Sequence, residues 1–115
     1  MTTSNDSELG TIHWPDEAAA VISDVKKHVQ QIFISSTLPT NDLEIYINLE
    51  TIECKHYTIR LSSNGFQIAG NSFDKIDDTN GFPYETPYAL LNVISPSFIL
   101  SFGDELSKKL KSIQH

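Results

Sequence analysis

The chain has 115 residues, of which 39% are hydrophobic and 20% are charged, and these values fit one ordinary globular domain with a modest core. Fifteen acidic against eight basic residues give a net charge of −7, which disfavours binding to nucleic acid or to anionic membranes. The single cysteine, Cys54, excludes an internal disulfide, and no apolar run approaches the length of a membrane span. We therefore expect a soluble protein of the cytosol, with the nucleus as a second location.

The N-terminal third of the chain predicts an arm and a helix. Residues 1–13 are polar without periodicity, so we expect a disordered arm that is not a signal peptide, followed by one domain over 14–115. From Pro15 or Asp16 to about Ser35, apolar residues recur at intervals of three and four, as in an amphipathic helix. These apolar residues are Ala18, Val21, Ile22, Val25, Val29, Ile32 and Phe33. A loop around Pro39 then ends the helical structure.

Strand periodicity dominates the middle of the chain. Apolar and polar residues alternate over 43–50 and over 53–61, which predicts two half-buried antiparallel strands. Asn64-Gly65 is typical of a type I′ turn, and a two-residue loop there would pair Leu61 with Ile68 in a hairpin. One face of this hairpin, which the first helix can cover, would carry Ile59, Leu61, Phe66 and Ile68.

The C-terminal part predicts two helices. A short helix runs from Tyr88 to about Ile94 behind the cap Thr86-Pro87, and a long amphipathic helix occupies 95–115. Ser95 offers a side-chain oxygen as N-cap of the long helix, with Pro96 at its first position. The apolar stripe of the long helix contains Phe98, Ile99, Phe102, Leu106, Leu110 and Ile113. The order of elements predicts an α+β fold with a single antiparallel three- to four-stranded sheet covered by the N-terminal helix.

Residues that could carry catalysis or bind metal are few and scattered. The four histidines, which we expect to be surface or half-exposed residues without metal-ligand spacing, are His13, His28, His56 and His115. Cys54 and His56 would lie on one face of a strand, but a nucleophile also needs an oriented base and an oxyanion site. The acidic loop before Gly81 lacks the carboxylates of an EF-hand. We expect no catalytic residues, no metal and no cofactor, with an enzyme as the minor hypothesis.

One set of spacings in the last helix resembles the glycogen synthase kinase-3 binding helix of axin and of the GSKIP family, the glycogen synthase kinase-3 beta interaction proteins. In that pattern a Phe is followed four residues on by a Leu, then by a basic residue just before a second Leu, an aliphatic residue and a polar amide or base. The matching apolar residues here are Phe102, Leu106, Leu110 and Ile113. The resemblance to the GSKIP domain continues upstream through 84–96 and 66–74, and covers almost all of 19–114.

This resemblance implies a non-catalytic adaptor that binds glycogen synthase kinase-3 through its last helix, inhibits or redirects the kinase, and so acts on Wnt signalling. The binding residues that it implies are Phe102, Leu106, Lys109, Leu110, Ile113 and Gln114. Other interpretations stay open. The stripe can pack on the protein's own core, or its first half, Phe98 to Phe102, can dock there while Leu106 onward projects. Domains of this type also occur in the large clustered-mitochondria proteins without implying kinase binding.

The resemblance also implies a second partner, because vertebrate members of the family anchor protein kinase A through an amphipathic helix near the N-terminus. The matching helix here is residues 18–33, and the candidate second site consists of Val21, Ile22, Val25 and Val29. Lys26 and Lys27 lie at the edge of this stripe, and a lysine ammonium does not enter an apolar groove cheaply. We therefore expect weak binding to the regulatory subunit of protein kinase A, and we expect a monomer.

Overall fold

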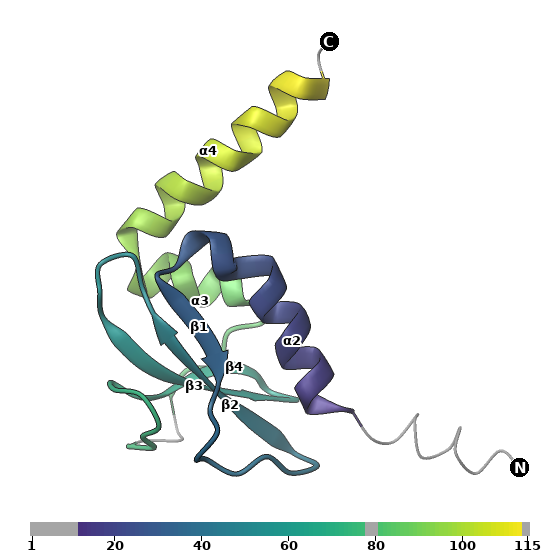
Figure 1. Cartoon of the computed structure of the whole chain (residues 1–115), viewed down its shortest axis with the longest axis vertical. Helices are drawn as coiled ribbons and strands as arrows, with labels where there is room; N and C mark the ends of the chain where they lie inside the picture. Colours follow the sequence, from purple (N-terminus) through teal and green to yellow (C-terminus); the bar gives the residue numbers. More distant parts are fainter. Residues whose placement is uncertain (1–11, 78–80, 114–115) are drawn as a thin grey trace, which may run out of the picture.

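The computed structural model describes residues 12–77 and 81–113. Within these ranges the chain forms a four-stranded antiparallel sheet with two helices, one N-terminal and one short C-terminal, packed against its inner face, and a last long helix that projects from the domain, as Figure 1 shows. This architecture confirms the predicted α+β class. Most of the predicted arm, residues 1–11, and the candidate site residue Gln114 lie outside the described residues.

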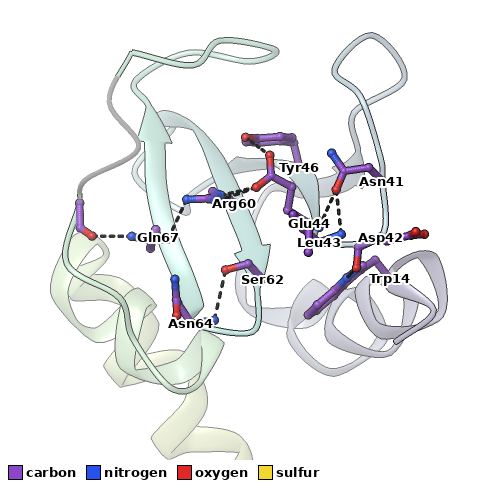
Figure 2. Close-up of polar contacts among 11 residues, drawn as sticks. Trp14, Asn41, Asp42, Leu43, Glu44, Tyr46, Arg60, Ser62, Asn64 and Gln67 are labelled. Carbon is purple, nitrogen blue, oxygen red and sulfur yellow. Dashed lines mark hydrogen bonds and ion pairs between the residues drawn. The ribbon is translucent and has the colours of Figure 1, made fainter. Parts of the chain in front are cut away.

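Helix α2, Trp14–Val25, covers the inner face of the sheet, as the sequence predicted. Pro15 occupies its first turn, where the missing N–H removes no hydrogen bond. The residues that α2 buries are Trp14, Ala18 and Val25. The Trp14 indole also donates a hydrogen bond of 2.9 Å to the carbonyl of Asp42, which ties the start of the helix to the loop before the sheet (Figure 2).

The prediction that this helix reaches Ser35 is wrong. A short 3-10 helix η1, Lys26–His28, follows α2, and strand β1, Gln31–Ile34, then forms one edge of the sheet. Ile32 packs against the core whereas Phe33 is 39% exposed, so this stretch fits strand alternation as well as helical periodicity. Pairing with the neighbouring strand satisfies the backbone of β1, and this tertiary contact decides between the two patterns.

The remaining strands are β2, Glu44–Glu50, β3, His56–Ser62, and β4, Gly65–Gly70. They lie in the order β1-β2-β3-β4, and every neighbouring pair is antiparallel. Strand β3 starts later than predicted because residues 51–55 form a turn in which Cys54 has a φ of 65°. The inner face of the sheet contributes to the core the side chains of Ile45, Ile47, Leu49, Ile59, Leu61 and Phe66.

The β3–β4 hairpin has a different register from the predicted one. Leu61 pairs with Phe66, and the two-residue loop is Ser63-Asn64 rather than Asn64-Gly65. Gly65 closes the loop with a φ of 111°, whereas a type I′ turn needs positive φ at both central residues. A Cβ on Gly65 would also collide with the carbonyl oxygen of Tyr84. The predicted face is nevertheless confirmed, because Leu61 and Phe66 both lie in the core.

Strand β2 is buried on both faces, so the prediction that it is half-buried is wrong. The segment 71–77 folds over the outer face, where Asn48 is fully buried and donates a 2.7 Å hydrogen bond to Asp74. Ser35 donates to the same carboxylate at 2.6 Å. These hydrogen bonds lower the pKa of Asp74. Alternation in the sequence predicts that a polar strand residue such as Asn48 faces solvent. It does not reveal that the segment 71–77 folds over this residue and buries it.

Farther along the outer face, an ion pair joins β2 to β3 (Figure 2). The guanidinium of Arg60 lies 2.6 Å from a carboxylate oxygen of Glu44, and the hydroxyl of Tyr46 donates to the other oxygen at 2.7 Å. Burial and this hydrogen bond raise the pKa of Tyr46 to about 12. The two faces of the sheet therefore differ, with an apolar core inside and hydrogen-bonded polar groups outside.

The C-terminal helices are α3, Pro87–Ile94, and α4, Pro96–Ile113. Thr86 caps α3 as predicted, because its side-chain oxygen accepts a 3.1 Å hydrogen bond from the N–H of Ala89. The chain turns at Ser95, and Figure 1 shows α4 running away from the sheet toward the C-terminus. Among the described helices, none has the length and apolar character needed to cross a bilayer.

Candidate partner-binding helix

Two sides of α4 have different surroundings. Successive residues of an α-helix are rotated by about 100°, which places Phe98, Ser101 and Glu105 on one side. Phe98 is only 1% exposed, and Ser101 and Glu105 are partly buried. We call these three residues the domain-facing stripe. We call the adjacent strip, centred about 100° around the helix axis from this stripe, the apolar ridge, and in the described side chains it consists of Phe102, Leu106 and Leu110.

A cluster of four rings holds the first turns of α4 against the domain. Phe98 and Phe102 of α4 pack with Tyr88 of α3 and with His28 of η1, at centroid distances between 5.3 and 6.3 Å. His28 is only 3% exposed, and its Nδ1 lies 2.8 Å from the hydroxyl oxygen of Ser101. The prediction that all four histidines are surface or half-exposed residues is therefore wrong for His28, because η1 carries this ring beneath α4.

The start of α4 is capped by Glu53, which the sequence did not indicate. The carboxylate of Glu53 accepts hydrogen bonds from the Ser95 hydroxyl at 2.9 Å and from the Ser97 N–H at 2.8 Å. The predicted capping role of the Ser95 side chain is thus replaced by a distant acid. Desolvation alone would raise the pKa of Glu53, but the hydrogen bonds from Ser97 and Ser95 outweigh it and lower this pKa to about 2. A negative charge here also suits the positive end of the helix dipole.

The apolar ridge becomes more exposed with distance from the sheet. The exposed fraction is 36% for Phe102, 49% for Leu106 and 54% for Leu110. Lys109 lies on the same side, with its ammonium 3.9 Å from Glu105 and its side chain 69% exposed. Phe102, Glu105, Leu106 and Lys109 line a shallow hollow. The structure thus brings four of the six predicted binding residues to one side of a projecting helix, and Ile113 belongs to the same helix.

The amino-acid sequence matches a known protein family. The family model for the GSKIP domain matches residues 14–113. The chain belongs to the GSKIP domain family. The GSK3B-interacting protein of Bos taurus is 39% identical over 99 residues, which cover 85% of this chain and 71% of the relative. The GSK3B-interacting protein of Homo sapiens is 38% identical with the same coverage, and Protein GSKIP homolog of Drosophila melanogaster is 27% identical over 84% of each chain.

In this GSKIP domain the candidate second site has a different environment from the ridge. Val21 and Ile22 are partly exposed on α2, but Val25 and Val29 are only 1% and 9% exposed and belong to the core cluster. Lys27 at the end of this stretch forms a 3.6 Å ion pair with Glu105 of α4. The four valine and isoleucine positions therefore do not form one exposed surface.

The other candidate residues of the GSKIP domain, Cys54 and His56, do not come together in one site. Cys54 lies in the turn before β3 with a φ of 65°, so the expectation that it shares a strand face with His56 is wrong. The ring of His56 instead stacks on Phe73 at 4.4 Å. Within 12–77 and 81–113, no three side chains of His, Cys, Asp or Glu gather in a way that could hold a metal ion.

Proposed function

We propose that this chain is a non-catalytic adaptor that binds glycogen synthase kinase-3 through the apolar ridge of α4. The observation that carries the proposal is the half-exposed pair Leu106 and Leu110 on the part of α4 that projects from the domain. Apolar residues four apart form the continuous row that a hydrophobic groove on a partner recognises. The names of the bovine and human relatives state that those proteins interact with this kinase, which supports the same partner for this chain.

The exposed part of the ridge supplies a substantial share of the energy needed for micromolar binding. Full burial of four side chains of the types of Phe102, Leu106, Leu110 and Ile113 from water contributes roughly 6 to 12 kcal/mol before the costs of association and side-chain ordering. Because Phe102, Leu106 and Leu110 are already about half buried in the free chain, the contribution on binding is about half of that, roughly 3 to 6 kcal/mol. Lys109 would pair with a carboxylate of the kinase, and its exposed contact with Glu105 is weak enough to exchange. We infer a dissociation constant of about 1 µM or somewhat lower, equivalent to about 8 kcal/mol, so that contacts of the kinase beyond these four side chains contribute the remainder.

An adaptor of this kind acts by occupying a docking groove. Because the ridge resembles the kinase-binding helix of axin, this chain and axin would compete for one groove. Binding would then inhibit or redirect the kinase and affect Wnt signalling in the cytosol or nucleus. A kinase assay with a short primed peptide and with an axin-dependent substrate separates the two effects: redirection lowers only phosphorylation of the second substrate, whereas inhibition lowers both.

The direct test is titration of purified glycogen synthase kinase-3 with the whole chain. Leu106→Gln should weaken binding at least tenfold, about 1.4 kcal/mol, because it removes a central apolar contact while keeping a good helix former. Leu43→Gln is the matched control, since Leu43 is 73% exposed and lies before β2. Equal affinities for wild type and Leu106→Gln would contradict the proposal.

For protein kinase A we propose weak binding at most. Val25 and Val29 belong to the core, and Lys26 and Lys27 carry charges next to the remaining apolar surface of α2. A dissociation constant below about 1 µM for a type II dimerisation domain would contradict this expectation. Replacing Lys26 by Leu together with Lys27 by Phe should raise the affinity if charge at the groove is the obstacle.

A further inference from the structure

Ile99 is a large apolar side chain on α4 that lies outside the kinase-binding spacing and yet is 55% exposed. At about 100° per residue it lies within about 20° of both Leu106 and Leu110 around the helix axis. It precedes Leu106 by two helical turns, about 10 Å along the axis. Ile99 therefore continues the apolar ridge toward the domain.

Phe102, the first residue of the ridge, is partly occupied by contacts within the domain. Its ring packs against Tyr88 at 5.3 Å, against Phe98 at 5.4 Å and against His28 at 5.6 Å. Only 36% of Phe102 is exposed, compared with 55% of Ile99 one turn earlier. At this end of the ridge, a partner would therefore meet Ile99 together with one side of Phe102.

We propose that Ile99 is an additional contact for glycogen synthase kinase-3, so that the docking surface of this chain extends one turn closer to the domain than the four-residue spacing. This inference rests on the proposed function. We assign the contact to the kinase rather than to a different partner. Ile99 lies in one row with Leu106 and Leu110 along the helix, so a single groove can receive all three side chains. The contact extends the binding surface to the first turns of α4, which pack on the domain through Phe98.

The neighbouring residue Leu100 provides a matched control. Leu100 is 76% exposed on the same turn, but it lies about 80° beyond Leu110 and thus off the ridge. Ile99→Gln should weaken kinase binding roughly fivefold or more in the titration described above, whereas Leu100→Gln should stay within about twofold of wild type. Melting temperatures of both variants should match wild type because both side chains are largely exposed.

The outcomes separate this inference from the proposed function. If Leu106→Gln weakens kinase binding and Ile99→Gln does not, the proposed contact of Ile99 is wrong, whereas the proposed binding through the apolar ridge is supported. If neither variant changes the affinity, both proposals fail. Sedimentation equilibrium tests the other occupant, a second copy of the chain. A dimer that Ile99→Gln dissociates, with unchanged kinase affinity, would assign Ile99 to self-association and overturn the inference.

Discussion

The two halves of α4 have the same apolar periodicity but different environments. In the first half, Phe98 is almost completely buried and Ser101 meets the buried ring of His28. In the second half, Leu106 and Leu110 are about half exposed. An apolar stripe in a sequence therefore indicates that something covers it, but it does not indicate whether the cover is the same chain or a partner.

The first half also explains how the second half can stand away from the domain. An isolated helix as short as this second half is marginal in water because its first turn is costly to form. Here Glu53 caps the first turn and four rings fix its orientation, so the nucleus of the helix is supplied by the domain. The distal turns then only propagate a helix that has already begun. A binding partner would meet a ridge that is largely formed in advance.

The largest effect should come from removing the buried anchor. Phe98→Ala should lower the free energy of unfolding by about 3 to 5 kcal/mol, since it leaves a cavity among the rings of His28, Tyr88 and Phe102. Each kcal/mol corresponds to a fall in melting temperature of roughly 4 to 8 °C in a domain of this size. Thermal unfolding followed by circular dichroism measures this fall in melting temperature. A shift of less than about 2 °C would mean that Phe98 is not an anchor.

The second prediction addresses the distal half. Leu110→Pro should reduce kinase affinity at least tenfold, because a proline removes a backbone hydrogen bond and clashes with the preceding turn at a local cost of about 3 kcal/mol. The melting temperature of the domain should change little, since Leu110 is 54% exposed. Titration and thermal unfolding of one variant thus separate the two halves. A large loss of thermal stability would show that the distal turns pack on the core.

The third prediction uses the cap of α4. Glu53→Gln should lower the free energy of unfolding by about 1 kcal/mol at pH 7, because it removes the charged cap. The pKa of Glu53 is about 2 in the folded chain and 4.5 ordinarily, so its charge stabilises the fold above pH 4.5. This contribution is lost as the pH falls toward 2. Denaturant unfolding of wild type and Glu53→Gln should give free energies of unfolding whose difference shrinks as the pH falls over this range. A difference that stays constant would contradict the capping role of the Glu53 charge.

The smallest effect should be at the ion pair between η1 and α4. Lys27 and Glu105 are 3.6 Å apart with side chains 63% and 33% exposed, and exposed pairs contribute about 0 to 1 kcal/mol. Lys27→Ala should therefore change the melting temperature by no more than about 8 °C. Melting temperatures measured at increasing salt supply the control. Salt should screen the Lys27–Glu105 pair in wild type, whereas Lys27→Ala has no such pair to screen. A fall in melting temperature as large as that expected for Phe98→Ala would show that the part of α4 packed on the domain extends beyond Glu105.

The amino-acid sequence alone was sufficient for features that depend on local periodicity and on short motifs. It determined the α+β class, the Thr86 cap of α3, the starts of both C-terminal helices, and the apolar residues that face the core from β2 and β3. The family, too, could be assigned from the last helix and its upstream matches. These features depend on neighbours in the chain, whose spacing the sequence states directly.

Tertiary structure decided everything that depends on residues far apart in the chain. The stretch around Ile32 fits a helix or a strand, and pairing with β2 made it a strand. His28 is buried because Phe98 and Phe102 close over it, and Glu53 caps α4 from a turn between two strands. Side-chain periodicity states which face is apolar, whereas burial depends on which other surface reaches that face. For α4, the rings of the domain pack against Phe98 and Phe102 in the first turns, whereas Leu106 and Leu110 farther along stay about half exposed.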